Sequence, residues 1–158
     1  MRIPRVLPLM AMFYLFCASA LGAVWYVDKD NASGVEDGHS WATAFTAIQL
    51  AIDAAFDDGG GEIWVAEGIY AGASDPVVSM EEYVYLYGGF AGTETQLTQR
   101  PPFPRPVPDP AESKLDGNRA SCVVISDGGR AVDGFTVVNG RTGIIRYHYG
   151  LDAWQDKR

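Results

Sequence analysis

The sequence has few of the residues on which most active sites and metal centres depend. Its 158 residues include two cysteines and two histidines, His39 and His148. Neither histidine has a nearby serine, cysteine or carboxylate in the arrangement of a catalytic triad or a zinc site. No serine lies in a nucleophile elbow. The sequence therefore contains no readable catalytic site.

Basic residues are also scarce, with 12 Lys and Arg against 20 Asp and Glu and a net charge of −8. Proteins that bind nucleic acid need clustered Lys and Arg to displace counterions from phosphates. Attraction to anionic lipid requires the same clustering. The composition therefore argues against nucleic acid and against a charged membrane surface as partners.

No apolar run is long enough to span a membrane. The longest, Val6–Phe16, is shorter than the ~20 residues that a spanning helix needs. Arg2 and Arg5 precede it, and the small residues Ala18–Ala20 follow it. A short basic segment, an apolar segment and a small-residue cleavage site are typical of a secretory signal peptide. We predict a signal peptide over residues 1–20 and a bacterial protein that is secreted or displayed at the cell surface, with no membrane insertion after cleavage.

Cleavage would leave the mature chain without a disulfide. Removal of the segment ending at Ala20, or at Gly22 as the alternative, takes away Cys17 and leaves Cys122 alone. One cysteine cannot form an intramolecular disulfide. The loss of two arginines also makes the mature chain more acidic, with a net charge of −10.

One amphipathic helix is predicted over Thr46–Phe56. Ile48, Ala51, Ile52 and Ala55 recur at the spacing that places side chains on one helix face. Thr46 and Gln49 match the pattern of a capping box.

The rest of the mature chain consists of short apolar segments separated by Gly, Asp and Asn. The expected strands are Val24–Val27, Glu62–Ala66, Ile69–Tyr70, Pro76–Met80, Tyr83–Tyr87, Ser113–Leu115, Cys122–Ile125, Val132 and Gly134–Val138, with a turn at Gly88–Gly89. The proline-rich segment 91–112 cannot pair inside a sheet, because proline lacks an N–H, so we predict a surface excursion. Many short strands indicate a sandwich, a barrel or a β-solenoid, and their shortness favours the solenoid.

Several blocks of sequence carry a resemblance to a known superfamily. They are Trp25–Asp28, Ser40–Phe45, Ile48–Ala55, Gly61–Tyr70, Tyr87–Thr95, Leu115–Asn118 and Val132–Gly140. Together they resemble the N-terminal region of bacterial exported right-handed parallel β-helix proteins of the pectate-lyase-like superfamily. The resemblance implies an all-β solenoid over residues 21–140: the start of a parallel β-helix, about three or four coils, with an N-terminal capping α-helix. Within this superfamily such blocks are specific for the fold and for export. They do not indicate an activity, because the same N-terminal region occurs in lyases and in surface proteins.

The pattern is lost after Gly140. Residues 141–158 form an atypical polar tail, whereas similar proteins continue with further coils. Our hypothesis is therefore that the chain is a truncated or frameshifted reading of a longer protein.

Tyr83, Tyr85 and Tyr87 alternate along one predicted strand and so share one face of it. If Val84 and Leu86 point inward, the tyrosines point outward as an aromatic row. Such a row is a candidate carbohydrate-binding site, and packing beneath the proline-rich segment is the alternative use.

The acidic loop after the first strand contains Asp28, Asp30, Asn31 and Asp37. Clustered oxygen ligands suit Ca²⁺, but their spacing does not match an EF-hand, and Asp and Asn also favour turns. We predict no cofactor, and calcium binding in this loop is the alternative.

Three functions remain open. The leading one is an exported scaffold segment of a surface or secreted protein that has no catalytic site. The alternatives are the N-terminal part of a polysaccharide lyase or glycoside hydrolase, and a small carbohydrate-binding module. The expected partner is a polysaccharide or a cell-surface glycan, and the sequence leaves the oligomeric state open.

Overall fold

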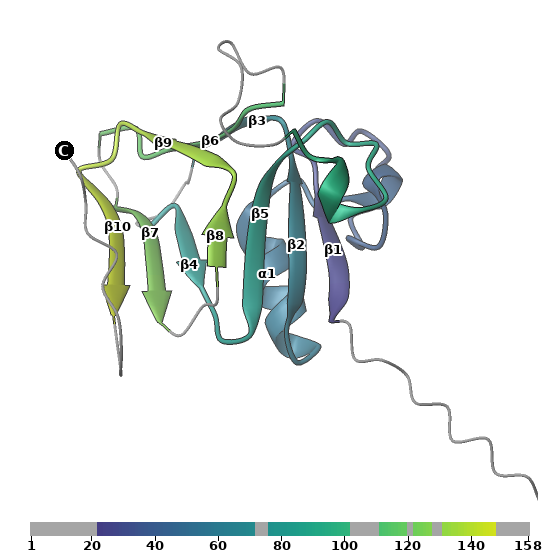
Figure 1. Ribbon diagram of the computed structural model, residues 1–158, viewed down its shortest axis with the longest axis horizontal. Coiled ribbons are helices and arrows are strands. Elements are labelled where there is room, and N and C mark those ends of the chain that lie inside the picture. The colour runs from purple at the N-terminus through teal and green to yellow at the C-terminus, as the bar shows by residue number, and fades with distance from the viewer. Residues whose placement is uncertain (1–21, 72–75, 102–110, 120–121, 128–130, 148–158) are drawn as a thin grey trace, which may run out of the picture.

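Parallel strands make up most of the structure. The computed structural model describes residues 22–71, 76–101, 111–119, 122–127 and 131–147 (Figure 1). The predicted signal peptide 1–20, residues 102–110 of the proline-rich segment and His148 lie outside the described residues.

The described elements are one α-helix, two short 3₁₀ helices and ten strands. In chain order they are β1 (Ala23–Val27), η1 (Trp41–Thr43), α1 (Ile48–Asp57), β2 (Gly61–Ala66), β3 (Gly68–Ala71), β4 (Val78–Met80), β5 (Val84–Phe90), η2 (Leu97–Gln99), β6 (Ser113–Asp116), β7 (Cys122–Asp127), β8 (Ala131–Asp133), β9 (Phe135–Val138) and β10 (Thr142–Tyr147).

The largest sheet has four strands in the order β1-β2-β5-β8, and we call it the first sheet. All its pairs are parallel. Its register aligns side chains across the strands, since Glu62 of β2 lies opposite Tyr85 of β5, and Trp64 lies opposite Tyr87. Figure 1 shows these strands side by side, with α1 behind them.

Two further sheets have three strands each, in the orders β3-β6-β9 and β10-β7-β4. Their pairs are also parallel. Consecutive strands from β2 onward belong to different sheets, so the chain returns to each sheet in turn. Parallel strands that are joined in this way need long connections, and every pairing is therefore distant in sequence.

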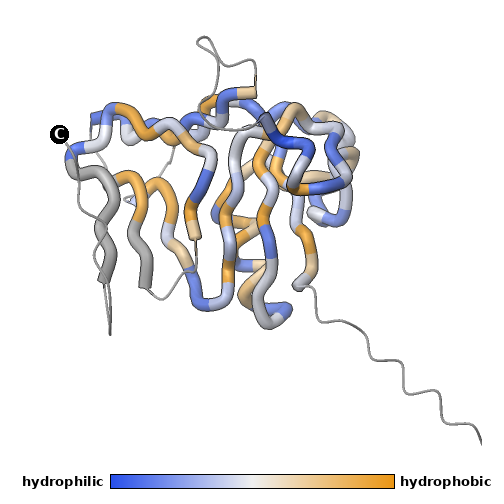
Figure 2. Tube along the Cα trace, viewed as in Figure 1, coloured by the Kyte–Doolittle hydropathy of each residue, from blue (hydrophilic) through white to orange (hydrophobic). Residues whose placement is uncertain are grey.

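A single apolar cluster joins the sheets and the helix. It includes Val27, Ile63, Val65, Val84, Leu86, Leu115 and Val124, all fully buried, together with the face of α1 formed by Ile48, Ala51, Ile52 and Ala55. Figure 2 shows apolar segments recurring along the strands. Burial of this surface is the main favourable contribution to folding.

The predicted fold class is wrong. We expected an all-β solenoid, the start of a right-handed parallel β-helix with an N-terminal capping helix. The structure instead has mixed α/β content, with three separate small parallel sheets and one helix. The helix is not an addition to an all-β body, because its buried residues belong to the same core cluster as the strands.

The predicted capping box is also wrong. Helix α1 begins at Ile48 after Ala47, and no side chain caps it. Thr46 donates from its backbone N and its hydroxyl to Glu36, both at 2.9 Å. The Gln49 amide instead bonds the backbone of Ser79 in β4, accepting at 2.9 Å and donating at 3.2 Å.

Two strand boundaries differ from the prediction. Gly88–Gly89 lies within β5 rather than forming a turn, and the register shifts opposite it between Trp64 and Ala66. Such a shift is a β-bulge, which glycines commonly occupy. A side chain at Gly88 would lie 2.9 Å from the Ser113 Cβ. In addition, β10 forms where we expected an atypical tail, and it pairs in parallel with β7.

Candidate functional site

The tyrosine row lies along and just before β5. Val84 and Leu86 are fully buried, so the intervening side chains face away from the core. Tyr83 is 53% exposed and Tyr85 is 37% exposed, whereas Tyr87 is half-buried. The rings of Tyr85 and Tyr87 stack with centroids 6.4 Å apart and an interplanar angle of 12°. The two ring planes are therefore nearly parallel.

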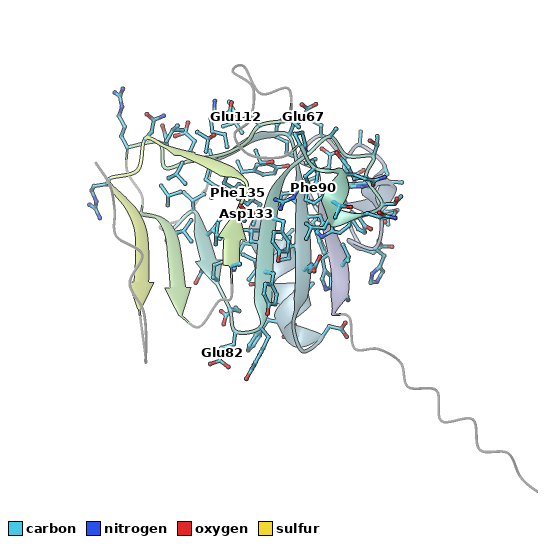
Figure 3. The ribbon with its side chains drawn as sticks, in the orientation of Figure 1. Glu67, Glu82, Phe90, Glu112, Asp133 and Phe135 are labelled. Carbon is cyan, nitrogen blue, oxygen red and sulfur yellow. The ribbon has the colours of Figure 1, made fainter. Side chains whose placement is uncertain are left out.

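An open cleft of about 590 Å³ brings the three tyrosines together with segments far from them in the sequence. It is lined by Gly22, Ala23, Asp58, Gly59, Gly60, Gly61, Glu62, Tyr83, Tyr85 and Tyr87. These residues come from the start of β1, the connection between α1 and β2, and the start of β5. The start of β5 lies near Glu82 at the lower end of the sheet (Figure 3).

The backbone fixes the position of Tyr83. Its φ of 64° is left-handed, a conformation that is costly for an aromatic residue. The Gly61 N–H donates to the Tyr83 carbonyl at 3.1 Å. Gly60 has a φ of 106°, and a Cβ there would lie 2.6 Å from the Tyr83 Cβ. The turn after α1 therefore needs glycine so that it can approach Tyr83.

Arg100 covers the other end of the row. Its guanidinium lies 5.1 Å from the Tyr87 ring centroid and 5.5 Å from that of Phe90. It also donates to Asp133 at 2.8 Å and to the Gly88 carbonyl at 3.0 Å. Burial, followed by the negative charge of Glu62, raises the pKa of Tyr87. Tyr87 is thus the inner, partly covered end of the row, and Tyr83 and Tyr85 are its exposed part.

A second aromatic group continues on the same face of the first sheet. Trp64 and Phe90 stack at 4.8 Å with an angle of 11°, and Tyr26 and Trp41 pack at their edges. Trp64 is only 4% exposed. Its indole N–H donates to Glu62 at 2.8 Å, which orients that carboxylate beside the cleft. This group is packed, so the accessible aromatic surface is at the tyrosine row.

The acidic loop uses its oxygens for local turns. Asp28 accepts from the Asp30 backbone at 2.9 Å, and Asp37 accepts from the His39 backbone at 3.0 Å. Asn31 bonds the carbonyls of Val35 and Ala44. Within the described ranges, no group of three or more His, Cys, Asp or Glu side chains is arranged to hold a metal ion.

Three further polar residues do not line the cleft. His39 packs on Trp25 with ring centroids 5.0 Å apart, and Lys114 pairs with Glu112 at 3.2 Å. Ser113 is fully buried and bonds the backbone. Sequence reasoning missed Asp58, Glu62 and the glycines as neighbours of the tyrosines. The only available signal was that the predicted helix ends in an acidic, glycine-rich turn.

None of the helices in the part of the chain that the structure describes is both long and apolar enough to cross a membrane.

No family model, curated protein or solved structure matches this chain. The resemblance to the pectate-lyase-like superfamily therefore stays a prediction from the sequence.

Proposed function

We propose that this chain is an exported scaffold that binds a polysaccharide or cell-surface glycan through the tyrosine cleft. The observation that carries the proposal is the cleft itself, which Tyr83, Tyr85 and Tyr87 line together with Asp58 and Glu62.

The geometry of the tyrosine rings suits a sugar chain. Pyranose rings present C–H groups on their faces, and these pack against flat aromatic surfaces, while their hydroxyls bond to polar groups at the edge. The exposed side chains of Tyr83 and Tyr85 provide the aromatic surface at the cleft. Two carboxylates provide hydrogen-bond acceptors at its side. The cleft is open, so it can accept an internal segment of a long chain.

The first prediction is that glycan binding depends on Tyr85. Tyr85→Ala removes the central exposed ring and should weaken binding about fivefold, since an aromatic stacking contact contributes about 1 kcal/mol. Affinity electrophoresis and calorimetry with soluble polysaccharides would measure the effect. Ile69→Ala is a matched control, because Ile69 is 56% exposed in β3 and does not line the cleft.

The outcomes separate the alternatives. Binding that is lost in Tyr85→Ala but kept in Ile69→Ala supports the proposal. Absence of binding to neutral, acidic and amino polysaccharides alike overturns it. Release of sugar products during incubation would show an enzyme and would overturn the scaffold part of the proposal.

A further inference from the structure

The described side chains that line the cleft carry charge of one sign. Among the described lining residues, Asp58 and Glu62 are the charged ones, and none is Lys, Arg or His. Glu81 and Glu82 directly precede Tyr83, and Asp57 precedes Asp58. A uronate chain placed on the tyrosines would bring its carboxylates toward these acids, and like charges repel.

The tyrosine faces also favour cations. Aromatic rings attract ammonium and guanidinium groups through the negative potential of their faces. Arg100 already demonstrates this at the covered end of the row, 5.1 Å from the Tyr87 ring centroid. Its charge is directed at Asp133 rather than into the cleft. The exposed part of the row therefore combines aromatic faces with carboxylates, which is the chemistry that binds an ammonium group.

We infer that the cleft selects glycans carrying free ammonium groups, such as chains of glucosamine, over uncharged glycans and over polyuronates. The inference rests on the proposed function and specifies its ligand class. Each ammonium group would lie between a tyrosine face and the carboxylate of Asp58 or Glu62. The acidic net charge of the chain adds long-range attraction for a polycation.

The test compares three oligosaccharides of equal length: one of glucosamine, one of N-acetylglucosamine and one of galacturonate. Below neutral pH, where the amines are protonated, calorimetry should show the glucosamine chain binding about tenfold more tightly than the acetylated chain. This ratio corresponds to a cation–π contact and an exposed ion pair together. The preference should shrink as the salt concentration rises.

Charge-neutral variants identify the residues responsible. Glu62→Gln and Asp58→Asn keep the side-chain shape, and each should reduce the preference severalfold, because binding of the free-amine chain should weaken more than binding of the acetylated chain. Glu67→Gln removes the same charge at the opposite end of the sheet (Figure 3) and should leave the preference unchanged. Asp58 is exposed, so Asp58→Asn tests the inference even if Glu62→Gln impairs folding.

Three results would overturn the inference: equal binding of the acetylated and free-amine chains, tighter binding of galacturonate, or an unchanged preference in both variants. In each of these cases glycan binding itself persists, and the proposed function stands. If none of the three chains binds and no other polysaccharide does, the proposed function fails as well.

Discussion

Ser113 shows how much of the structure depends on one buried hydroxyl. The side chain is fully buried at the start of β6. Its Oγ accepts from the Gly89 N–H of β5 at 2.8 Å and lies 2.9 Å from the Ala66 carbonyl, to which it donates. It therefore satisfies backbone groups at the bulge, where the first-sheet ladder is interrupted.

The prediction at this scale concerns Ser113→Ala. The substitution removes this partner from the Gly89 N–H and from the Ala66 carbonyl, and the loss of these buried hydrogen bonds should lower the free energy of unfolding by about 1 kcal/mol. Urea unfolding followed by circular dichroism would measure it. Ser33→Ala removes a hydroxyl that bonds the backbone in an exposed loop, and it should change stability by less than about 0.5 kcal/mol. Equal effects of the two variants would contradict this account.

Among the elements, α1 has a role that helical periodicity does not reveal. Strand β4 lies at one edge of the β10-β7-β4 sheet, where backbone groups would otherwise lack a neighbouring strand. The Gln49 side chain bonds both the N–H and the carbonyl of Ser79 there. A helix side chain thus takes the place of a strand and protects an edge that would otherwise be open to pairing with other chains.

Gln49→Ala should therefore destabilise the fold by about 1–2 kcal/mol, because the two backbone groups of Ser79 lose their protein partner. It should also increase aggregation, measured by light scattering on warming. Asp53→Ala is the control. Asp53 accepts a separate, exposed hydrogen bond from the same amide at 2.9 Å, and its loss should cost less than about 0.5 kcal/mol. Comparable destabilisation by both would show that the edge contact contributes nothing.

Element positions were more predictable from the sequence than the contacts between elements. The buried face of α1 follows directly from its spacing, and the alternation in β5 correctly placed Val84 and Leu86 in the core. The turn predicted at Gly88–Gly89 is wrong, because glycine is typical of a β-bulge as well as of a turn. The predicted capping box does not form, because each of its two residues has another partner. Thr46 bonds Glu36, and Gln49 bonds Ser79. Neither partner belongs to the capping-box pattern.

At the scale of the whole molecule, the sequence does not indicate which distant segments pair with each other. A single sequence gives no direct signal for parallel pairing between distant strands, so neither the three separate sheets nor the place of α1 in the core could be derived. The site shows the same limit. The tyrosines could be placed on one face by alternation, whereas Asp58 and Glu62 join them only through the pairing of β2 with β5.

Stability against acid is a property of the whole molecule that depends on carboxylates in separate loops. Hydrogen bonds from the backbone and hydroxyl of Thr46 lower the pKa of Glu36. Hydrogen bonds from the Asn118 backbone and the Asn139 side chain lower the pKa of Asp116. A carboxyl whose pKa is lower in the folded than in the unfolded state stabilises the fold above its unfolded pKa. That stabilisation is lost as the pH falls through the folded value.

The melting temperature should therefore fall once the pH drops below about 4, the range of unperturbed Asp and Glu. The combined variant Glu36→Gln, Asp116→Asn keeps side-chain acceptors at both positions but cannot titrate there, so its melting temperature should decline less steeply between pH 5 and pH 2 (roughly the window set by these pKa directions). Thermal melts monitored by circular dichroism across this range would measure both slopes. The double variant Asp57→Asn, Glu82→Gln, at two exposed positions, controls for the change in net charge. An equally steep decline in the combined variant would show that these two loops do not set the acid limit of the fold.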